Sequence, residues 1–313
     1  MKETVVVALG GNALIKPGEE GTASQMRKNI RQALENILDA VSPEAALVIT
    51  HGNGPQVGTL LLKDDAGTRH YGTVSYPLDM LVAETQGELG YLIESELRNL
   101  LTSRGIDREA ATLVTMVEVS PDDPGFSSPQ KRVGKMYSED EARVLEKEKK
   151  WRFAPEIKQN TKGYRRVVAS PKPLALVNGE ALKTLVQRGF ITVTAGGGGI
   201  PVMRIGGKLM PVAAVIDKDL ASALVAREVR ADRFIILTDV PAVYVGFAGP
   251  RRKALEYLRL EELDKLTQAG EFGKGNMLPK IQAARDFVLQ TGKEALITDF
   301  EGLKKGKGTR IGP

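Results

Sequence analysis

The chain has 313 residues, of which 42% are hydrophobic and 27% charged, and its formal net charge is +5. Such a chain can form one large α/β domain or two lobes with a sizeable core. It has no cysteine and two histidines, which excludes disulfides and Cys-based zinc sites and argues against a His-rich metal site.

The charge distribution favours a small anionic partner. Lys and Arg are spread along the chain and only 5% of the residues are aromatic, so a nucleic-acid partner is the weaker interpretation. No apolar run approaches the roughly 18–20 residues that span a bilayer. A strand-like run begins at residue 5, so we expect no signal peptide, no membrane partner and a cytoplasmic protein.

Short Val/Ile/Leu-rich runs alternate with helical patterns along the chain. The runs predict strands at residues 5–9, 47–50, 113–119, 191–195, 234–238 and 295–298. Helices are predicted at residues 24–41, 78–101, 179–188, 218–230, 261–269 and 279–290. Continuous apolar runs are typical of strands that are buried on both faces of a parallel sheet. We therefore predict an α/β fold, a three-layer α/β/α sandwich with a mostly parallel central sheet.

Residues 120–166 interrupt this alternation. The segment opens with turn-forming Pro, Asp and Gly residues and then holds a charged helix, with Ser138 and Glu141 at capping-box spacing. Few of its residues suit a central core. It is interpreted as an inserted subdomain or lid, and a solvated excursion is the alternative.

Three glycine-rich turns each follow a predicted strand. They contain Gly10, Gly11 and Asn12; Gly52, Asn53 and Gly54; and Gly196, Gly197, Gly198 and Gly199. One such turn alone is more often a tight turn than a ligand site. Ligands of open α/β sheets bind beyond the carboxyl ends of the strands, and backbone N–H groups of glycine turns can hold an anion. Three turns at one edge therefore indicate phosphate binding.

Two lysines lie beside predicted helix starts. Lys218 begins the 218–230 helix and Lys280 follows Pro279 at the second position of its helix. A bound phosphate would offset the unfavourable contact between a cation and a helix N-terminus; a solvated surface lysine is the alternative for each. Asp217 suits the role of N-cap, and Asp219 either complements the helix dipole or holds the lysines. We expect His51 to orient its own loop.

Common nucleotide and hydrolase motifs are missing from the sequence. No segment has the Walker A spacing, no predicted strand is followed by G-x-G-x-x-G, and no G-x-S-x-G elbow occurs. Together with the glycine turns and the lysines, this indicates a phosphoryl-transfer site that is built without a Walker loop.

Longer stretches of the chain resemble carbamate kinases, of the amino-acid-kinase fold family. The matching stretches cover residues 8–14, 50–58, 163–168, 170–171, 195–202, 214–221 and 236–240, in the family's order and across nearly the whole length. The chain departs from the family pattern at Pro241 and at residues 276–278. These departures leave the charged residues of the expected site intact.

The resemblance implies an enzyme that transfers a phosphoryl group reversibly between ATP and carbamate, giving ADP and carbamoyl phosphate. It implies a substrate lobe (residues 1–212) with the lid, a nucleotide lobe (residues 213–313), Mg²⁺ bound with ATP or ADP, and a homodimer. A leucine-rich stripe at residues 89–101 is weaker evidence for the dimer, because such a stripe could form an interface. The alternative is that it packs in the core of its own chain. A kinase for another small carboxylate and a non-catalytic nucleotide sensor stay open as alternative functions.

The resemblance also implies roles for individual residues. Lys131, Lys218, Asp219 and Lys280 match catalytic positions. The three glycine turns, from Gly10 to Asn12, Gly52 to Gly54 and Gly196 to Gly198, would bind substrate or phosphate. No protein metal ligands are expected, because few carboxylates converge. The candidates for the nucleotide pocket are Asp217, Thr238, Asp239, Val240, Tyr244, Gly275 and Met277.

Overall fold

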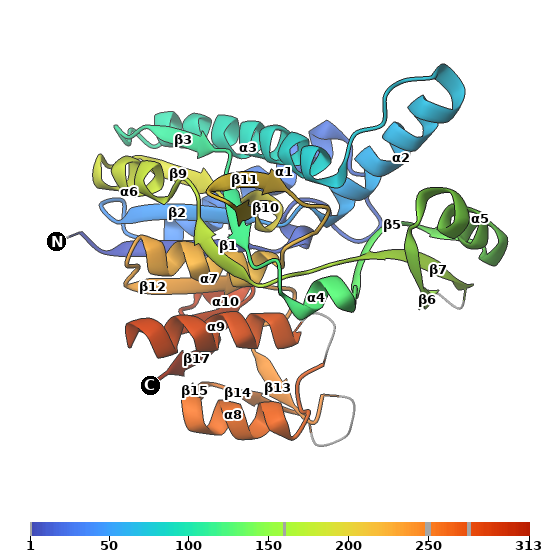
Figure 1. Ribbon diagram of the computed structural model, residues 1–313. Helices are drawn as coiled ribbons and strands as arrows, with labels where there is room; N and C mark the ends of the chain where they lie inside the picture. The colour runs from blue at the N-terminus through green and yellow to red at the C-terminus, as the bar shows by residue number, and fades with distance from the viewer. Residues whose placement is uncertain (1, 159–160, 248–251, 274–276) are drawn as a thin grey trace.

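A computed structural model describes residues 2–158, 161–247, 252–273 and 277–313. Its centre is an eight-stranded sheet (Figure 1). The strands follow the order β15 (Tyr257–Arg259), β17 (Thr309–Gly312), β16 (Ala295–Thr298), β12 (Arg233–Leu237), β1 (Thr4–Leu9), β2 (Ala46–His51), β9 (Ile191–Thr194) and β3 (Ala110–Leu113). All neighbours pair in parallel except β16 and β17. The predicted sandwich with a mostly parallel sheet is confirmed.

Helices cover both faces of this sheet. One face packs against α6 (Gly179–Gln187), α7 (Lys218–Glu228), α8 (Leu260–Gln268) and α9 (Met277–Thr291). The other packs against α1 (Ala23–Ala40), α3 (Leu78–Ser103) and α10 (Phe300–Lys304). Strand β1 contributes side chains to the hydrophobic cores on both faces of the sheet. Val6 and Ala8 face the α7 side, while Val5, Val7 and Leu9 face the α1 side. This explains why its sequence is a continuous apolar run.

Smaller elements complete the molecule. A second sheet has the order β11 (Lys208–Pro211), β10 (Ile200–Ile205), β4 (Met116–Val119) and β8 (Pro173–Leu176), and a hairpin pairs β13 (Val243–Val245) with β14 (Lys253–Leu255). Further short or peripheral helices are η1 (Gly11–Ala13), α2 (Gly54–Tyr71), α4 (Pro124–Ser127) and η2 (Gly196–Gly198).

The segment that interrupts the sequence pattern forms a protruding subdomain (Figure 1). An antiparallel sheet with the order β5 (Lys131–Tyr137), β7 (Thr161–Val168) and β6 (Arg152–Lys158) packs with α5 (Glu139–Lys149). The capping box of Ser138 and Glu141 is present at the start of α5. As predicted, few of its residues enter the two cores that flank the central sheet. Tyr137, Ala142 and Leu145 form a small core of their own, and Val133 is buried at the base among residues of α2 and α3.

The predicted strand at residues 113–119 is two strands in two sheets. Strand β3 ends at Leu113 and β4 begins at Met116 in the second sheet. Thr115 lies at the bend, where its N–H donates to Gln86 Oε1 at 2.8 Å and its hydroxyl bonds to Thr194 at 2.6 Å. These side-chain partners satisfy the backbone where the chain leaves the sheet, and an apolar pattern does not reveal them.

The helices differ from the prediction at α2 and α9, and the structure decides between the two alternatives for the stripe on α3. Helix α2 was not predicted. Helix α9 begins at Met277, so Lys280 is its fourth residue, and Pro279 is tolerated in the first turn, where N–H groups lack intrahelical partners. The leucine-rich stripe of α3 is buried within its own chain, with Leu89, Ile93 and Leu97 each 0% exposed. The stripe is ordinary core and gives no support to a dimer.

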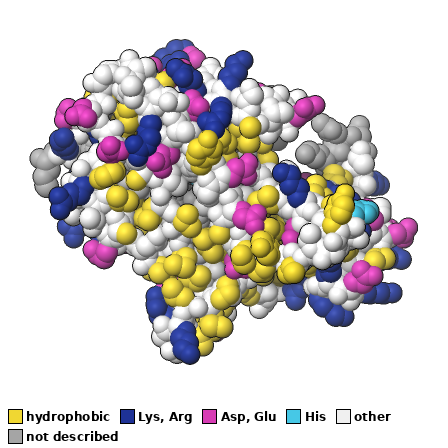
Figure 2. Space-filling view, turned by 90° about the horizontal axis from the view of Figure 1, so that it is seen from above, with side chains coloured by type: hydrophobic (Ala, Val, Ile, Leu, Met, Phe, Trp, Pro, Cys, Tyr) yellow, Lys and Arg dark blue, Asp and Glu magenta, His cyan; other side chains and the backbone are white. Residues whose placement is uncertain are grey.

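The surface carries mixed charge. On the face seen in Figure 2, Lys and Arg side chains are scattered among acidic ones rather than gathered into one stripe. Within the ranges that the structure describes, no helix is both long and apolar enough to cross a membrane. The lobe boundary at residue 212 stays a prediction, since β1 and β12 pair within one continuous sheet.

Candidate active site

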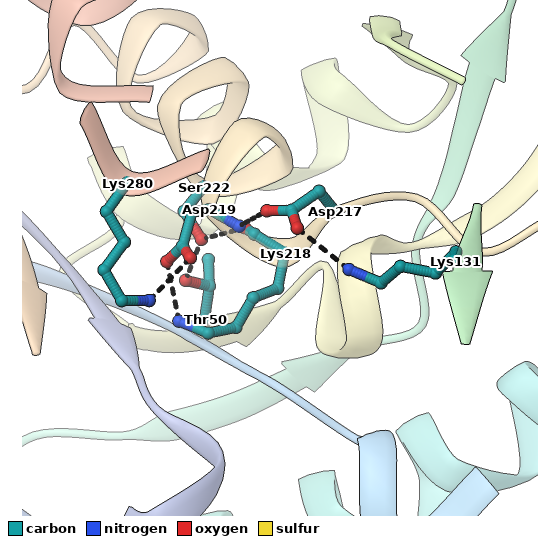
Figure 3. Close-up of polar contacts among 7 residues, drawn as sticks. All are labelled: Thr50, Lys131, Asp217, Lys218, Asp219, Ser222 and Lys280. Carbon is teal, nitrogen blue, oxygen red and sulfur yellow. Dashed lines mark hydrogen bonds and ion pairs between the residues drawn. The ribbon is translucent and has the colours of Figure 1, made fainter. Parts of the chain in front are cut away.

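Three lysines and two carboxylates meet at the start of α7 (Figure 3). Asp217 is the N-cap of this helix, as predicted, and its Oδ1 accepts a hydrogen bond from the N–H of Asp219 at 2.9 Å. Asp219 Oδ1 accepts from Lys218 Nζ at 2.7 Å, and Asp219 Oδ2 accepts from Lys280 Nζ at 2.8 Å. The sequence places Lys218 and Lys280 at helix starts; the structure adds that one carboxylate holds both.

This cluster is shielded from water. The side chains of Asp219, Lys280 and Lys218 are 5%, 9% and 16% exposed. Burial alone would raise the pKa of Asp219, but the charges of Lys218 and Lys280 outweigh it and hold that pKa at about 2. Burial lowers the pKa of Lys218 below 10.5, partly offset by Asp219. Two ammonium groups that share one carboxylate leave a net positive charge, which suits an incoming phosphate.

The first two glycine turns adjoin Lys218. Gly52 lies against this side chain, since a Cβ added to Gly52 would be 3.2 Å from Lys218 Cδ and 3.8 Å from the backbone nitrogen of Gly11. The Gly52 N–H donates to Leu9 O at 3.3 Å, which ties the two turns together. Gly10 packs against the backbone of Leu237. The predicted meeting of these turns with a lysine at one edge is thus observed.

Two hydroxyl groups that the sequence did not single out fix the start of α7. Ser222 Oγ donates to Lys218 O at 2.6 Å, and Thr50 and Ser222 hydroxyls lie 2.6 Å apart. Because the Ser222 hydrogen goes to the carbonyl, Thr50 donates to Ser222. Both residues are fully buried. The i to i+4 spacing of Lys218 and Ser222 was visible in the sequence, but the contact with β2 was not.

The third glycine turn supports the second one. Gly196 packs against the ring of His51, Gly197 against the amide of Asn53, and Gly198 against the carbonyl of Ile216. Asn53 Nδ2 in turn donates to Thr85 Oγ1 at 2.8 Å. Gly197 and Gly198 also have positive φ angles of 65° and 95°. The structure explains these glycines by close packing; a direct contact of this turn with phosphate stays a prediction.

Gly197→Ala should destabilise the fold. The added Cβ would lie 2.1 Å from Asn53 Nδ2, at a φ of 65°, and overpacking of this kind typically costs about 1–3 kcal/mol. Gly206→Ala is the control, because Gly206 has a similar φ of 57° with nothing within 4 Å of its added Cβ. Urea denaturation should show a larger loss for Gly197→Ala; equal losses would reject the packing role.

Lys131 reaches the cluster from the lid. It is the first residue of β5, and its Nζ donates to Asp217 Oδ2 at 2.9 Å. His51 is 1% exposed, and its Nδ1 lies 3.0 Å from Gly52 O, so Nδ1–H donates to its own loop. Burial lowers the pKa of His51 to about 4. The expectation that His51 orients its loop fits this contact.

The nucleotide candidates are spread more widely. Thr238 and Asp239 line a cavity of about 300 Å³ with Gly10 and residues of α1 and α10, on the opposite face of the sheet from α7. Tyr244 lies on β13 with the Arg252 guanidinium 4.1 Å from its ring centroid. Val240 lies in the turn after β12, and Met277 begins α9. Gly275 and the Asn12 side chain lie outside the described residues.

The carboxylates beside the lysines are already engaged. Asp219 accepts from two lysines, and Asp217 accepts from Lys131 and a backbone N–H. Within the described part of the chain, no three His, Cys, Asp or Glu residues form a group that could hold a metal ion. This donor set fits a divalent cation that is carried mainly by nucleotide phosphates and water.

Comparison with known proteins agrees with this fold. The model of the amino acid kinase family matches residues 3–299. Carbamate kinases from Pyrococcus horikoshii and Haemophilus influenzae are 42% and 45% identical, covering 100% and 98% of this chain and 100% and 96% of theirs. The chain belongs to the amino acid kinase family.

A solved structure extends the similarity to three dimensions. The structure of carbamate kinase from Giardia lamblia bound to AMP-PNP has a TM-score of 0.91 and 35% sequence identity, and the match covers 99% of this chain and 98% of that one. Within the family, this chain is therefore similar over its full length to carbamate kinases.

Proposed function

We infer that this protein is a carbamate kinase, a phosphotransferase that interconverts ATP plus carbamate with ADP plus carbamoyl phosphate. The observation that supports this most directly is the pair of largely shielded lysines on Asp219, placed beside two glycine turns at the carboxyl edge of the sheet. Full-length similarity to carbamate kinases supports the choice of acceptor.

Phosphoryl transfer by this site rests on position and charge. A carbamate oxygen attacks the γ-phosphorus of ATP, the bond from that phosphorus to the β–γ bridging oxygen breaks, and ADP leaves with the electron pair. Carbamate is already an anion at its nucleophilic oxygen, so the reaction needs no general base. This agrees with a neutral His51 that is held by its own loop.

Lys218 and Lys280 would offset the charge that develops on the transferring group. Asp219 holds both lysines, so the donors are in place before the reaction and need little reorganisation. The backbone nitrogen of Gly11 lies beside Gly52, which packs against Lys218, so the Gly11 N–H would face the same anion. When bound with the nucleotide, Mg²⁺ would supply further positive charge to the phosphate oxygens.

The defining experiment is ATP formation from ADP and carbamoyl phosphate, with and without Mg²⁺. Turnover that requires all three components would support the proposed function. Parallel assays with acylamino acids and ATP test the related-kinase alternative, and failure with every acceptor would favour a nucleotide sensor. The homodimer stays a prediction from the family resemblance, and cytoplasmic location stays a prediction from the sequence pattern.

The rate should fall at alkaline pH. Burial lowers the pKa of Lys218 below its ordinary value of 10.5, so rising pH removes the ammonium charge before an exposed lysine would lose its own. We expect kcat/KM, which reports the free enzyme, to decline on a limb that begins below pH 10.5. Lys218→Arg keeps its charge at these pH values, and its profile should lack that limb. If kcat/KM declines at the same alkaline pH in the wild-type enzyme and in Lys218→Arg, the decline is caused by another group.

A further inference from the structure

Asp217 joins the lid to the catalytic turn. One of its oxygens caps α7 by accepting the Asp219 N–H at 2.9 Å, and the other accepts from Lys131 Nζ at 2.9 Å. Asp219, two residues later, holds Lys218 and Lys280 in the same way (Figure 3). Two carboxylates at the start of α7 thus fix the three ammonium groups of Lys131, Lys218 and Lys280 beside this helix end.

The cap alone does not require a carboxylate. An N-cap uses one side-chain oxygen, and Asn or Ser serves as well as Asp. The second oxygen of Asp217 faces a cation whose side chain is 35% exposed, while the Asp217 side chain is 15% exposed. In this partly shielded position the ion pair is weakened less by solvent than a surface pair.

The backbones on both sides of the pair are also fixed. Val215 N–H, two residues before Asp217, donates to Ala169 O at the end of β7. Val133, Val168 and Val215 pack in one buried cluster with residues of α2 and α3. The base of the lid is therefore joined to the segment that leads into α7. Because these backbones are held, the position of Lys131 Nζ depends on its side-chain partner.

We propose that Asp217 is a positioning residue that holds Lys131 for the incoming phosphate, rather than a ligand of the nucleotide. Lysine has three N–H donors, so Lys131 can bond to Asp217 and still present donors to a phosphoryl oxygen. This inference rests on the proposed function for its kinetic readout, but it concerns phosphate binding whichever acceptor the enzyme uses.

Three variants test the pairing: Asp217→Asn, Lys131→Ala and the double variant. In Asp217→Asn one oxygen remains for the cap, while an NH₂ donor replaces the oxygen that faces Lys131. We expect kcat/KM for carbamoyl phosphate to fall about tenfold, the lower end for loss of a charge-assisted hydrogen bond, with the Kd of ADP unchanged. In the Lys131→Ala background, Asp217→Asn should have no further effect.

A matched control separates this role from capping. Asp123 is the N-cap of α4, and its oxygens accept only backbone N–H groups, from Gly125 and Lys172, among the described contacts. Asp123→Asn should therefore leave kcat, KM and the Kd of ADP unchanged. Additive losses in the double variant, a weaker ADP affinity in Asp217→Asn, or an increased affinity for phosphate would each overturn the proposal.

Binding of inorganic phosphate, measured from the rise in Tm with phosphate concentration, supplies a readout without turnover. It should weaken to a similar extent in the two single variants and the double variant. If the wild-type enzyme makes no ATP from carbamoyl phosphate while this pattern holds, the proposed function fails and the positioning role stands. If turnover is normal but the two substitutions act independently on phosphate binding, the positioning role fails alone.

Discussion

Replacing Lys218 with alanine should lower kcat by about 10²–10³-fold, equivalent to about 2.7–4 kcal/mol of transition-state stabilisation. The reason is that Lys218 is a largely shielded cation, fixed by Asp219 beside the glycine turns that follow β1 and β2. The fold should survive, because Asp219 retains Lys280 as a partner. Steady-state kinetics and titration with ADP would measure the change, and we expect the Kd of ADP to change far less than kcat.

Lys208→Ala is the control for this experiment. Lys208 lies exposed on β11, so its loss removes one positive charge from the protein without touching the cluster. Its kcat should match that of the wild-type enzyme. A near-normal kcat in Lys218→Ala would refute the catalytic role of this lysine.

Asp219→Asn should damage both stability and catalysis. The substitution leaves two nearly buried ammonium groups without their shared counter-charge, and removal of one partner from a buried ion pair typically destabilises a protein by about 3–5 kcal/mol. The lysines would also lose the carboxylate that holds them in position for the transferring phosphoryl group. Thermal unfolding should show a lower Tm, and assays should show a kcat reduced at least as much as in Lys218→Ala.

Inorganic phosphate gives a second test of the same substitution. An anion bound between Lys218 and Lys280 would replace part of the lost charge, so phosphate should raise the Tm of Asp219→Asn more than it raises that of wild type. Asp122→Asn, at an exposed position in the lid, should behave like wild type. A stable, active Asp219→Asn enzyme would show that the lysines do not need this carboxylate.

The sequence predicted those parts of the site that depend on neighbours along the chain. Asp217 as N-cap and Lys218 at the first position of α7 follow from local helix chemistry. The turns at Gly10 and Gly52 were placed correctly because a strand ends just before each one. These features can be predicted because each depends only on residues that are close together in the sequence.

Contacts between distant segments were beyond that kind of prediction. Lys131 and Asp217 are 86 residues apart, and Thr50 and Ser222 are 172 apart, so their pairing depends on how the sheet is assembled. Helix α2 was missed because its sequence carries glycines and few apolar residues; it contacts β5 and α3. The glycines at 196–198 were found, but their close packing on His51, Asn53 and Ile216 could not be inferred from composition.

The pairing of β1 with β12 sets a limit on how the two halves of the chain can move. Four residue pairs, from Val5 with Arg233 to Ala8 with Ile236, join the strands that carry the two halves, and adjacent strands lie only about 4.8 Å apart. A wide opening of the halves about a hinge would break this ladder and expose the apolar edge of β1. Under the proposed function, substrate entry and product exit would rely on side chains, loops and the protruding subdomain, all outside this sheet. The distance between the phosphoryl donor and the acceptor would then be set by the paired strands.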